Sequence, residues 1–294
     1  MSNTALLGLL AETSIHAGAG QMAGVIDLPI QREAHTEWPV VFGSAVKGAL
    51  RTLADEQQAP WRFAVFGPEI NKINNALDHA GALLVSDARL LLLPVRSLTS
   101  HFKWVTCPAL LKRFKIDVKR LQLNDADFAI PEFDNNKKEM ALVANEATGA
   151  LFLEEFKFTA KAADLDALIK ALAQLMDRDD AVSALKQQLA IVHDDRFKHL
   201  AKFATPVNAH ICIDNKTKTV KPGALWYEES LPADTVLYVG LHAQAARIDK
   251  EKKTAVEVLS HITDELFSRP YLQLGGNETV GMGWCKVAIC KAGG

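Results

Sequence analysis

The stretch Ala5-Leu-Leu-Gly-Leu-Leu-Ala11 is a short apolar run that ends at Glu12. Its length and apolar character predict a buried strand. A different pattern begins at Ser44, where apolar residues recur at the i, i+3, i+4 and i+7 positions of an amphipathic helix, with Ser44 as the expected N-cap. The segment from Ala82 to Val95 then returns to extended character. The amino-terminal part therefore predicts the order strand, helix, strand.

The carboxyl-terminal part repeats this arrangement. Thr235 to Leu241 is predicted to be a strand, and a second helical stripe runs from Ala255 to Leu266, before Pro270. A closing strand is expected from Trp284 to Ile289. Two split β-α-β halves predict an α+β fold with a ferredoxin-like (RRM-like) sheet and helices on one of its faces.

A long insertion separates the halves. It begins with a basic stretch, Lys103 to Arg120, which holds six basic residues and one acidic residue and is a candidate basic patch. A strongly helical segment runs from Leu165 to Met176. After it, polar and apolar residues alternate from Val207 towards Val220 around turn residues at Asp214, which predicts a hairpin with a basic tip.

Composition excludes several classes of protein. The 294 residues are 49% hydrophobic and 23% charged, which is typical of a globular protein. A net charge of -2 removes the simplest argument for nucleic-acid binding, so only local patches are candidates for binding phosphate. No apolar stretch reaches the roughly 20 residues of a membrane helix, and Met1 to Leu10 lack the basic region of a secretory signal. Four cysteines without CxxC spacing favour a reducing, cytoplasmic location.

Two glycine-rich loops resemble nucleotide-binding motifs only superficially. Gly18 to Gly24 has GxGxxxG spacing, and Pro29 follows where a phosphate-binding helix would have to run, so we exclude a Rossmann site. Gly276 to Gly281 has the gap of a P-loop, but Met282 and Gly283 occupy the positions of the required Lys and Ser or Thr. Each loop taken alone is more typical of a simple turn.

The segment Gly43 to Arg51 predicts an anion site. Lys47 and Arg51 are four residues apart on the expected helix, and its amino terminus adds unpaired N–H groups that favour a phosphate. The alternative is a solvated basic face on a core helix.

Asp27 and His16 are candidate catalytic residues. A carboxylate beside RNA can position a divalent ion or assist deprotonation of a 2′-hydroxyl, and histidine can serve in acid–base steps. Asp27 can equally cap a turn or pair with Arg32, and His16 can simply form a hydrogen bond within its loop. The cluster His193 to His199 lacks the helical i, i+4 histidine pair of a metal site, and we interpret it as surface.

Six segments together carry a resemblance to the RAMP superfamily of CRISPR proteins. In chain order they are His16–Gln21, Ile26–Arg32, Gly43–Arg51, Ser86–Arg89, Pro94–Ser97 and Leu274–Gly283. They are most similar to the repeated backbone subunit of the type III-B (Cmr) effector complex. The match covers nearly the whole chain, and the combination is far more specific than any one segment.

The resemblance implies a single RAMP domain over 1–294. Its palm, ferredoxin-like, would comprise about 1–95 and 233–294, with a helical insertion at about 96–205 and a protruding β-hairpin thumb at about 206–232. Several copies would stack into a helical filament along a guide RNA, together with other Cmr complex subunits. Each thumb would flip a nucleotide out of the duplex between guide and target.

The resemblance also implies a metal-dependent endoribonuclease that cleaves complementary single-stranded target RNA, with Mg²⁺ or Mn²⁺ as its divalent cation. Asp27 matches the catalytic aspartate, and His16 and Glu228 match positions near that site. The residues expected to bind guide RNA are Ser44, Lys47, Arg51, Gly275, Gly276, Gly281 and Gly283. We expect no residue set dedicated to a metal and no membrane partner.

Three other functions stay open from the sequence. A purely architectural guide-binding subunit would assemble without cutting, and a stand-alone RAMP ribonuclease would cleave precursor repeats as an isolated chain. A small-molecule α+β enzyme would use the glycine loops, which fit no nucleotide fingerprint.

Overall fold

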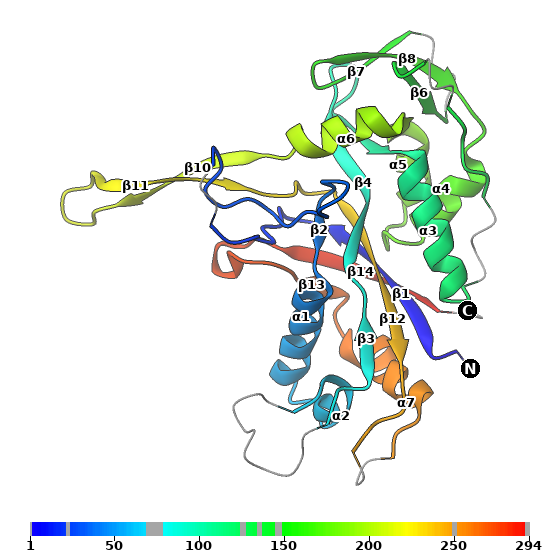
Figure 1. The fold of residues 1–294 in the computed structure, drawn as a ribbon, viewed down its shortest axis with the longest axis vertical. Coiled ribbons are helices and arrows are strands. Elements are labelled where there is room, and N and C mark those ends of the chain that lie inside the picture. Colours follow the sequence, from blue (N-terminus) through cyan, green and yellow to red (C-terminus); the bar gives the residue numbers. More distant parts are fainter. Residues whose placement is uncertain are drawn as a thin grey trace.

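The computed structural model describes residues 2–21, 24–68, 79–123, 128–133, 137–144, 149–248 and 252–291. These residues form a 12-stranded mixed sheet, helices that cover it, and a separate two-stranded hairpin (Figure 1). No helix in these ranges is long and apolar enough to cross a membrane.

The elements follow one another along the chain, and all but two of the described strands join the large sheet. In chain order they are β1 (Thr4–Ala11), β2 (Val40–Val41), α1 (Gly43–Glu56), α2 (Arg62–Phe66), β3 (Leu83–Val85), β4 (Ala88–Arg96), β5 (Phe102–Thr106), α3 (Pro108–Arg120), β6 (Met140–Val143), β7 (Ala150–Leu153), β8 (Phe156–Ala162), α4 (Asp166–Ala173), α5 (Ala181–Gln188), β9 (Leu189–Val192), α6 (Asp194–Phe203), β10 (Val207–Ile213), β11 (Val220–Glu229), β12 (Val236–Ala243), α7 (Ala255–Ser260), the π-helix η2 (His261–Leu266), β13 (Tyr271–Gln273), the 3₁₀ helix η3 (Glu278–Val280) and β14 (Trp284–Lys291).

The predicted β-α-β halves form the centre of the sheet. Strand β1 lies between β12 and β14, and β12 also pairs with β3 and β4, all antiparallel. Helix α1 lies in the chain between β1 and β3, and α7 lies between β12 and β14. The predicted central strands and both helical stripes are therefore confirmed. The expected single strand from Ala82 to Val95 is divided at Ser86 and Asp87 into β3 and β4.

Helices cover both faces of this sheet, whereas the sequence led us to expect helices on one face. All eight residues of β1 are buried. Leu7 and Leu9 belong to a core shared with α1 and α7, and Leu6 and Leu10 belong to a second core shared with α3, α4 and α5. Because successive side chains of a strand point to opposite faces, a strand that is apolar throughout needs a cover on each side.

The insertion is not purely helical, which corrects the sequence expectation. It contains α3 to α6, but it also adds β5 to β9, which extend the central sheet beyond β4. Strand β5 pairs with β9 in parallel, with Trp104 opposite Leu189. Strands β6, β7 and β9 are runs of four apolar residues, which periodicity does not distinguish from a helix segment. Strand β8 alternates apolar and polar residues throughout, so a strand signal was present there and the prediction missed it.

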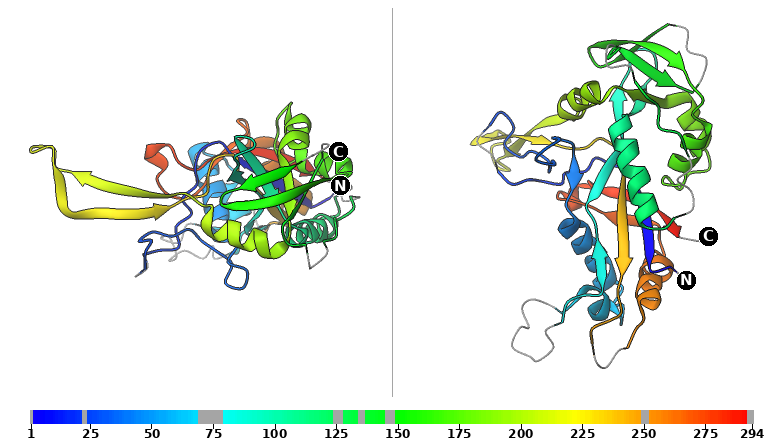
Figure 2. Two further views of the ribbon diagram at one scale, coloured as in Figure 1. Left: turned by 90° about the horizontal axis from the view of Figure 1, so that it is seen from above. Right: turned by 45° about the vertical axis from the view of Figure 1, so that its right-hand side comes forward.

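The hairpin β10–β11 extends away from the rest of the molecule (Figure 2). Its register pairs Val207 with Glu229 and Ile211 with Leu225. At the tip, the backbone amides of Lys216 and of the next residue donate to the Asp214 carboxylate. The predicted hairpin is confirmed: β11 begins at Val220, where the alternating pattern ended, and reaches Glu229, inside the expected bounds of about 206–232.

Candidate functional site

Asp27 is held at the base of the hairpin. The segment after the first glycine loop runs beside β11: the Leu28 amide donates to the Tyr227 carbonyl at 3.1 Å, and the Glu229 amide donates to the Leu28 carbonyl at 3.0 Å. The Tyr227 amide donates to Oδ2 of Asp27 at 2.7 Å. Oδ1 of the half-buried Asp27 has no hydrogen-bond partner among the described residues, so this oxygen is available to a ligand.

His16 also contacts β11, at Glu229. It is 8% exposed, and its Nδ1 lies 2.7 Å from the backbone carbonyl oxygen of Glu229. Because a carbonyl only accepts, Nδ1 carries the proton in the neutral ring and Nε2 carries the lone pair. Gly18 lies against Nε2, where an added Cβ would approach to 2.9 Å.

Glu228 links His16 to the second glycine loop. Its side chain is nearly buried, and Oε1 lies 3.8 Å from Nδ1 of His16. The same oxygen accepts a hydrogen bond from the side-chain amide of Asn277, which has a left-handed backbone conformation in the loop. The structure thus brings Asp27, His16 and Glu228 together on the last residues of β11. Arg32 pairs with Glu229, so the suggested pairing of Asp27 with Arg32 is wrong.

The second glycine loop packs on the segment that carries His16. The Gly276 amide donates to the His16 carbonyl at 2.8 Å, and a Cβ at Gly275 would lie 2.4 Å from that oxygen. Gly283 has a φ of 84° and its amide donates to the Ser14 carbonyl at 2.8 Å. Packing therefore explains the absence of a side chain at Gly275 and at Gly283, where a Cβ would lie 2.1 Å from the Leu274 carbonyl oxygen, whereas a Cβ at Gly276 would make only ordinary van der Waals contact with His16. Around Gly281 the space is open.

Ser44 does not cap helix α1, which corrects the sequence prediction. The helix begins at Gly43, its N-cap residue is Phe42, and Ser44 lies exposed in the first turn. The carboxylate of Asp87, from the turn between β3 and β4, accepts the hydrogen bond of the Gly43 amide at 2.7 Å. A carboxylate supplied by another part of the chain takes the place of a local cap, because the orphan amides of a helix start can be satisfied from any direction.

Lys47 and Arg51 differ in how free their charges are. Arg51 donates to the Pro68 carbonyl at 3.2 Å and lies 3.6 Å from the Asp55 carboxylate. Lys47 is half-buried, and burial together with the charge of Arg51 lowers the pKa of its ammonium group. Lys47 has no ion pair within the described ranges, so it is the more available of the two cations.

The site offers few ligands to a metal ion. In the described part of the chain, no three His, Cys, Asp or Glu side chains come together in a metal-binding group. Within the described ranges Oδ1 of Asp27 has no hydrogen-bond partner, whereas Oε1 of Glu228 accepts from Asn277. Mg²⁺ commonly takes one or two carboxylates and completes its shell with water and substrate phosphate. The residues therefore fit a hydrated ion that RNA helps to hold, and they do not fit a site made by protein alone.

The cluster His193 to His199 has a structural role. Nδ1 of His193 accepts a hydrogen bond from the Asp195 amide and caps α6, and His199 lies 3.1 Å from Glu155. The interpretation as surface holds for Asp195 and His199, but the side chain of His193 is only 12% exposed.

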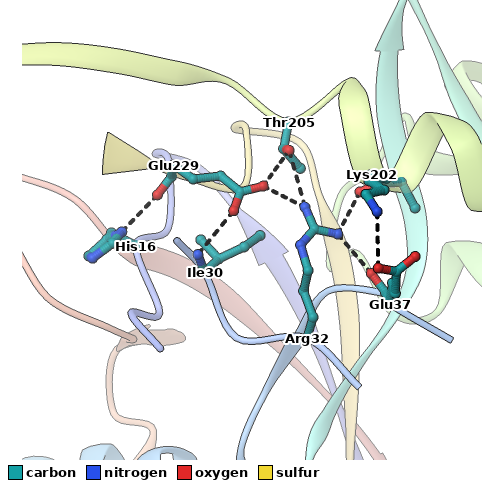
Figure 3. A network of polar contacts seen from close by, with 8 residues as sticks. His16, Ile30, Arg32, Glu37, Lys202, Thr205 and Glu229 are labelled. Atoms are coloured by element: carbon teal, nitrogen blue, oxygen red, sulfur yellow. Dashed lines mark hydrogen bonds and ion pairs between the residues drawn. The ribbon is translucent and has the colours of Figure 1, made fainter. Parts of the chain in front are cut away.

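Sequence reasoning missed four polar residues of this region. They are Arg32, Thr205, Glu229 and Asn277. The sequence did contain a signal for Glu229. Glu228 and Glu229 are adjacent acids in a strand, and because successive side chains of a strand point to opposite faces, one of the two is expected to point towards the interior. Figure 3 shows Glu229 between His16, Ile30, Arg32 and Thr205.

The family model of the RAMP superfamily matches residues 9–286. Over 292 residues the chain is 37% identical to a Pyrococcus furiosus protein named CRISPR system Cmr endoribonuclease Cmr4, covering 97% of this chain and 95% of the relative. It is 23% identical over 299 residues to a Saccharolobus solfataricus protein named CRISPR system CMR subunit Cmr4, covering 93% and 92%.

Solved structures show the same similarity. Oligomeric Cmr4 from Pyrococcus furiosus superposes with a TM-score of 0.74 at 28% identity and covers 99% of both chains. A chain of the type III-B Cmr-beta complex bound to cognate target RNA also gives a TM-score of 0.74, at 20% identity, covering 97% of this chain and 96% of that one, which supports the fold alone. The family match, the full-length identity and the shared fold agree, and the chain belongs to the RAMP superfamily, among the Cmr4 proteins of CRISPR systems.

Proposed function

We propose that this protein is the repeated backbone subunit of a type III-B CRISPR ribonucleoprotein that binds guide RNA and cleaves complementary target RNA at regular intervals. The observation that carries the proposal is the position of Asp27, whose Oδ2 accepts from the Tyr227 amide while Oδ1 has no partner among the described residues. The full-length similarity to a protein named Cmr endoribonuclease supports it, and the oligomeric relative supports stacking of copies. Other Cmr subunits would complete the particle.

The parts of the fold have separate roles in this proposal. Strands β14, β1, β12 and β4 with α1 and α7 correspond to a ferredoxin-like palm, because their order and connections match two split β-α-β units. The hairpin β10–β11 is the thumb, and residues 96–205 are the insertion, all within one RAMP domain of 1–294. The active residues lie where the thumb leaves the palm.

Cleavage would use the nucleophile that RNA itself carries. The 2′-hydroxyl oxygen attacks the neighbouring phosphorus, the hydroxyl proton passes to a base, and the bond to the 5′-oxygen breaks as that oxygen takes up a proton. A nucleotide splayed by the thumb gives the in-line geometry. Asp27 orients the site through its free oxygen, and the Nε2 lone pair of His16 provides a proton acceptor. A divalent cation, Mg²⁺ or Mn²⁺, held by Asp27 and RNA, would neutralise charge on the phosphate.

Guide RNA would be bound through its phosphates. On α1, Lys47 is the cation more available to a phosphate, because Arg51 already contacts Pro68 and Asp55. Ser44 lies about one helical turn before Lys47. The loop from Gly275 to Gly283 would offer its backbone, most directly at the open Gly281. A subunit with a net charge of -2 can still line an RNA groove, because stacked copies place one small basic strip beside the next.

The test is Asp27→Asn in a complex assembled with guide RNA. We expect cleavage of complementary target to fall by about 100-fold or more, with assembly and target affinity retained. Asp179→Asn, an exposed carboxylate in the insertion, is the control and should cut normally. Loss of assembly would assign Asp27 a structural role, and unchanged cutting would favour the purely architectural subunit. Cleavage of precursor repeats by the isolated chain would favour the stand-alone ribonuclease.

A further inference from the structure

Both backbone polar groups of Glu229 hold a part of the candidate site. Its amide donates to the Leu28 carbonyl at 3.0 Å, one residue beyond Asp27. Its carbonyl accepts from Nδ1 of His16 at 2.7 Å and thereby selects the tautomer that leaves Nε2 unprotonated. Glu229 therefore contacts both the segment that follows Asp27 and the side chain of His16.

The side chain of Glu229 extends these contacts. It is 2% exposed. Oε2 accepts from the Ile30 amide at 3.1 Å, and Oε1 accepts from Nη2 of Arg32 at 2.5 Å and from the Thr205 hydroxyl at 2.6 Å (Figure 3). The carboxylate thus joins the Asp27 loop to the chain at the end of α6.

Several hydrogen bonds also hold Arg32, the partner of Glu229, in place. Its Nη1 donates to the backbone carbonyls of Glu37 and Ala201, both at 2.8 Å. Nη2 also lies 3.3 Å from the Thr205 hydroxyl. The guanidinium is therefore locked between the loop, α6 and the base of the hairpin, and its charge compensates the buried carboxylate.

Asp27 itself has a single described hydrogen bond, from Tyr227. Its position must therefore be set by the backbone that follows it, and that backbone is bound to Glu229 at Leu28 and Ile30. A displacement of about 1 Å in a catalytic group can cost on the order of 100-fold in rate. Contacts within a few residues of Asp27 are enough to control such a displacement.

We propose that Glu229, paired with Arg32, is a positioning residue that holds the Asp27 loop and His16 in register for cleavage without touching RNA. This inference rests on the proposed function. Burial keeps Glu229 from contacting a ligand directly, so it acts through Asp27 and His16. Its loss changes the cleavage step and leaves the binding of guide and target unchanged.

The test compares Glu229→Gln with wild type in complexes assembled on guide RNA. Glutamine keeps an acceptor for the Ile30 amide but removes the charge that Arg32 requires. Two quantities are measured: the single-turnover cleavage constant at saturating target, and the Kd for target. We expect the cleavage constant to fall by at least about 10-fold and the Kd to stay within about twofold.

Asp117→Asn is the matched control. Asp117 is also a buried carboxylate, 7% exposed, that accepts hydrogen bonds from Tyr238 at 2.8 Å and Arg89 at 2.5 Å. It contacts none of the candidate catalytic residues. This variant should lose thermal stability as Glu229→Gln does, while its cleavage constant stays at the wild-type value.

Two results overturn the inference. One is a wild-type cleavage constant in Glu229→Gln, and the other is a loss of cleavage that Asp117→Asn reproduces to the same degree. If Glu229→Gln does not assemble, Thr205→Val is tested in its place, because it removes the hydroxyl that donates to Oε1 and keeps the carboxylate. A slower cleavage constant at unchanged Kd for target supports the inference. A wild-type cleavage constant in Thr205→Val overturns it. A wild-type complex that never cuts would refute the proposed function instead, so the two failures are distinguishable.

Discussion

At the scale of single residues, Gly275 and Gly281 both have a positive φ but lie in different surroundings. Their φ angles are 87° and 83°. A Cβ at Gly275 would lie 2.4 Å from the His16 carbonyl oxygen, whereas nothing lies within 4 Å of a Cβ at Gly281. Gly281→Ala should cost about 1 kcal/mol of unfolding free energy through φ alone, and Gly275→Ala at least ~2 kcal/mol, because it must also displace His16. Urea unfolding measures both, and equal losses would contradict the contact.

The charge of Lys47 gives a pH prediction. Burial and Arg51 lower its pKa in the free protein, whereas a bound phosphate favours the charged form. Guide binding should therefore take up a proton at alkaline pH, and guide affinity should fall as pH rises through the lowered pKa of Lys47. Titration of affinity against pH tests this, with Lys47→Arg as the control that should show no such fall. In Lys47→Ala the salt dependence of binding should weaken by about one unit of slope.

A pH profile of guide affinity identical in wild type and Lys47→Arg would remove Lys47 from the groove.

Individual residues were only partly predictable. Asp27 and His16 were recognisable as candidates, but their common position on β11 depends on hydrogen bonds to residues about 200 positions away. Asn277 carries no local signal of its role, since an asparagine in a glycine loop is a typical turn residue, and for Glu229 the neighbouring acid Glu228 indicates only that one of the two side chains points inward, not what it contacts. Only the folded chain brings them to the site.

At the scale of elements, two substitutions test which side chain caps the start of α1. Asp87 accepts the hydrogen bond of the Gly43 amide, and Ser44 makes no side-chain cap. Asp87→Ala should lower the unfolding free energy by about 1 kcal/mol, and Ser44→Ala should leave it unchanged. Thermal unfolding of the two variants measures this difference. A larger loss for Ser44→Ala would restore the cap that the sequence suggested.

The hairpin should be dispensable for folding. Along β10 no residue is buried, and Ile211 and Leu225 on its paired strands are about half exposed. Replacing residues 212–224 with Asn-Gly closes the hairpin at this pair with a favourable turn. The change in unfolding free energy should stay below about 1 kcal/mol, while assembled complexes should lose the regular spacing of target cuts. A destabilised chain, or cuts with unchanged spacing, would contradict the separate role of the hairpin.

Periodicity predicted the central strands, both helical stripes and the hairpin, since each is long or strongly patterned. It failed for the insertion strands β5 to β9, because most of them are only four or five residues long and gain stability from strands distant in sequence. It also failed for the number of covered faces, although the uninterrupted apolar run of β1 was itself the sign of burial on both sides.

At the scale of the whole molecule, the account depends on an arrangement that one chain cannot display. Each copy contributes one Asp27, one thumb and one small basic strip, and cleavage at regular intervals requires these to repeat along the guide. Electron microscopy of the complex with guide and a target carrying 2′-deoxy substitutions at the cut linkages tests this most directly. We predict that in every copy Oδ1 of Asp27 lies about 3 Å from a splayed linkage, directly or through one water or ion. Asp27 remote from every ribose–phosphate junction, or this chain bound away from the hybrid, would contradict the account.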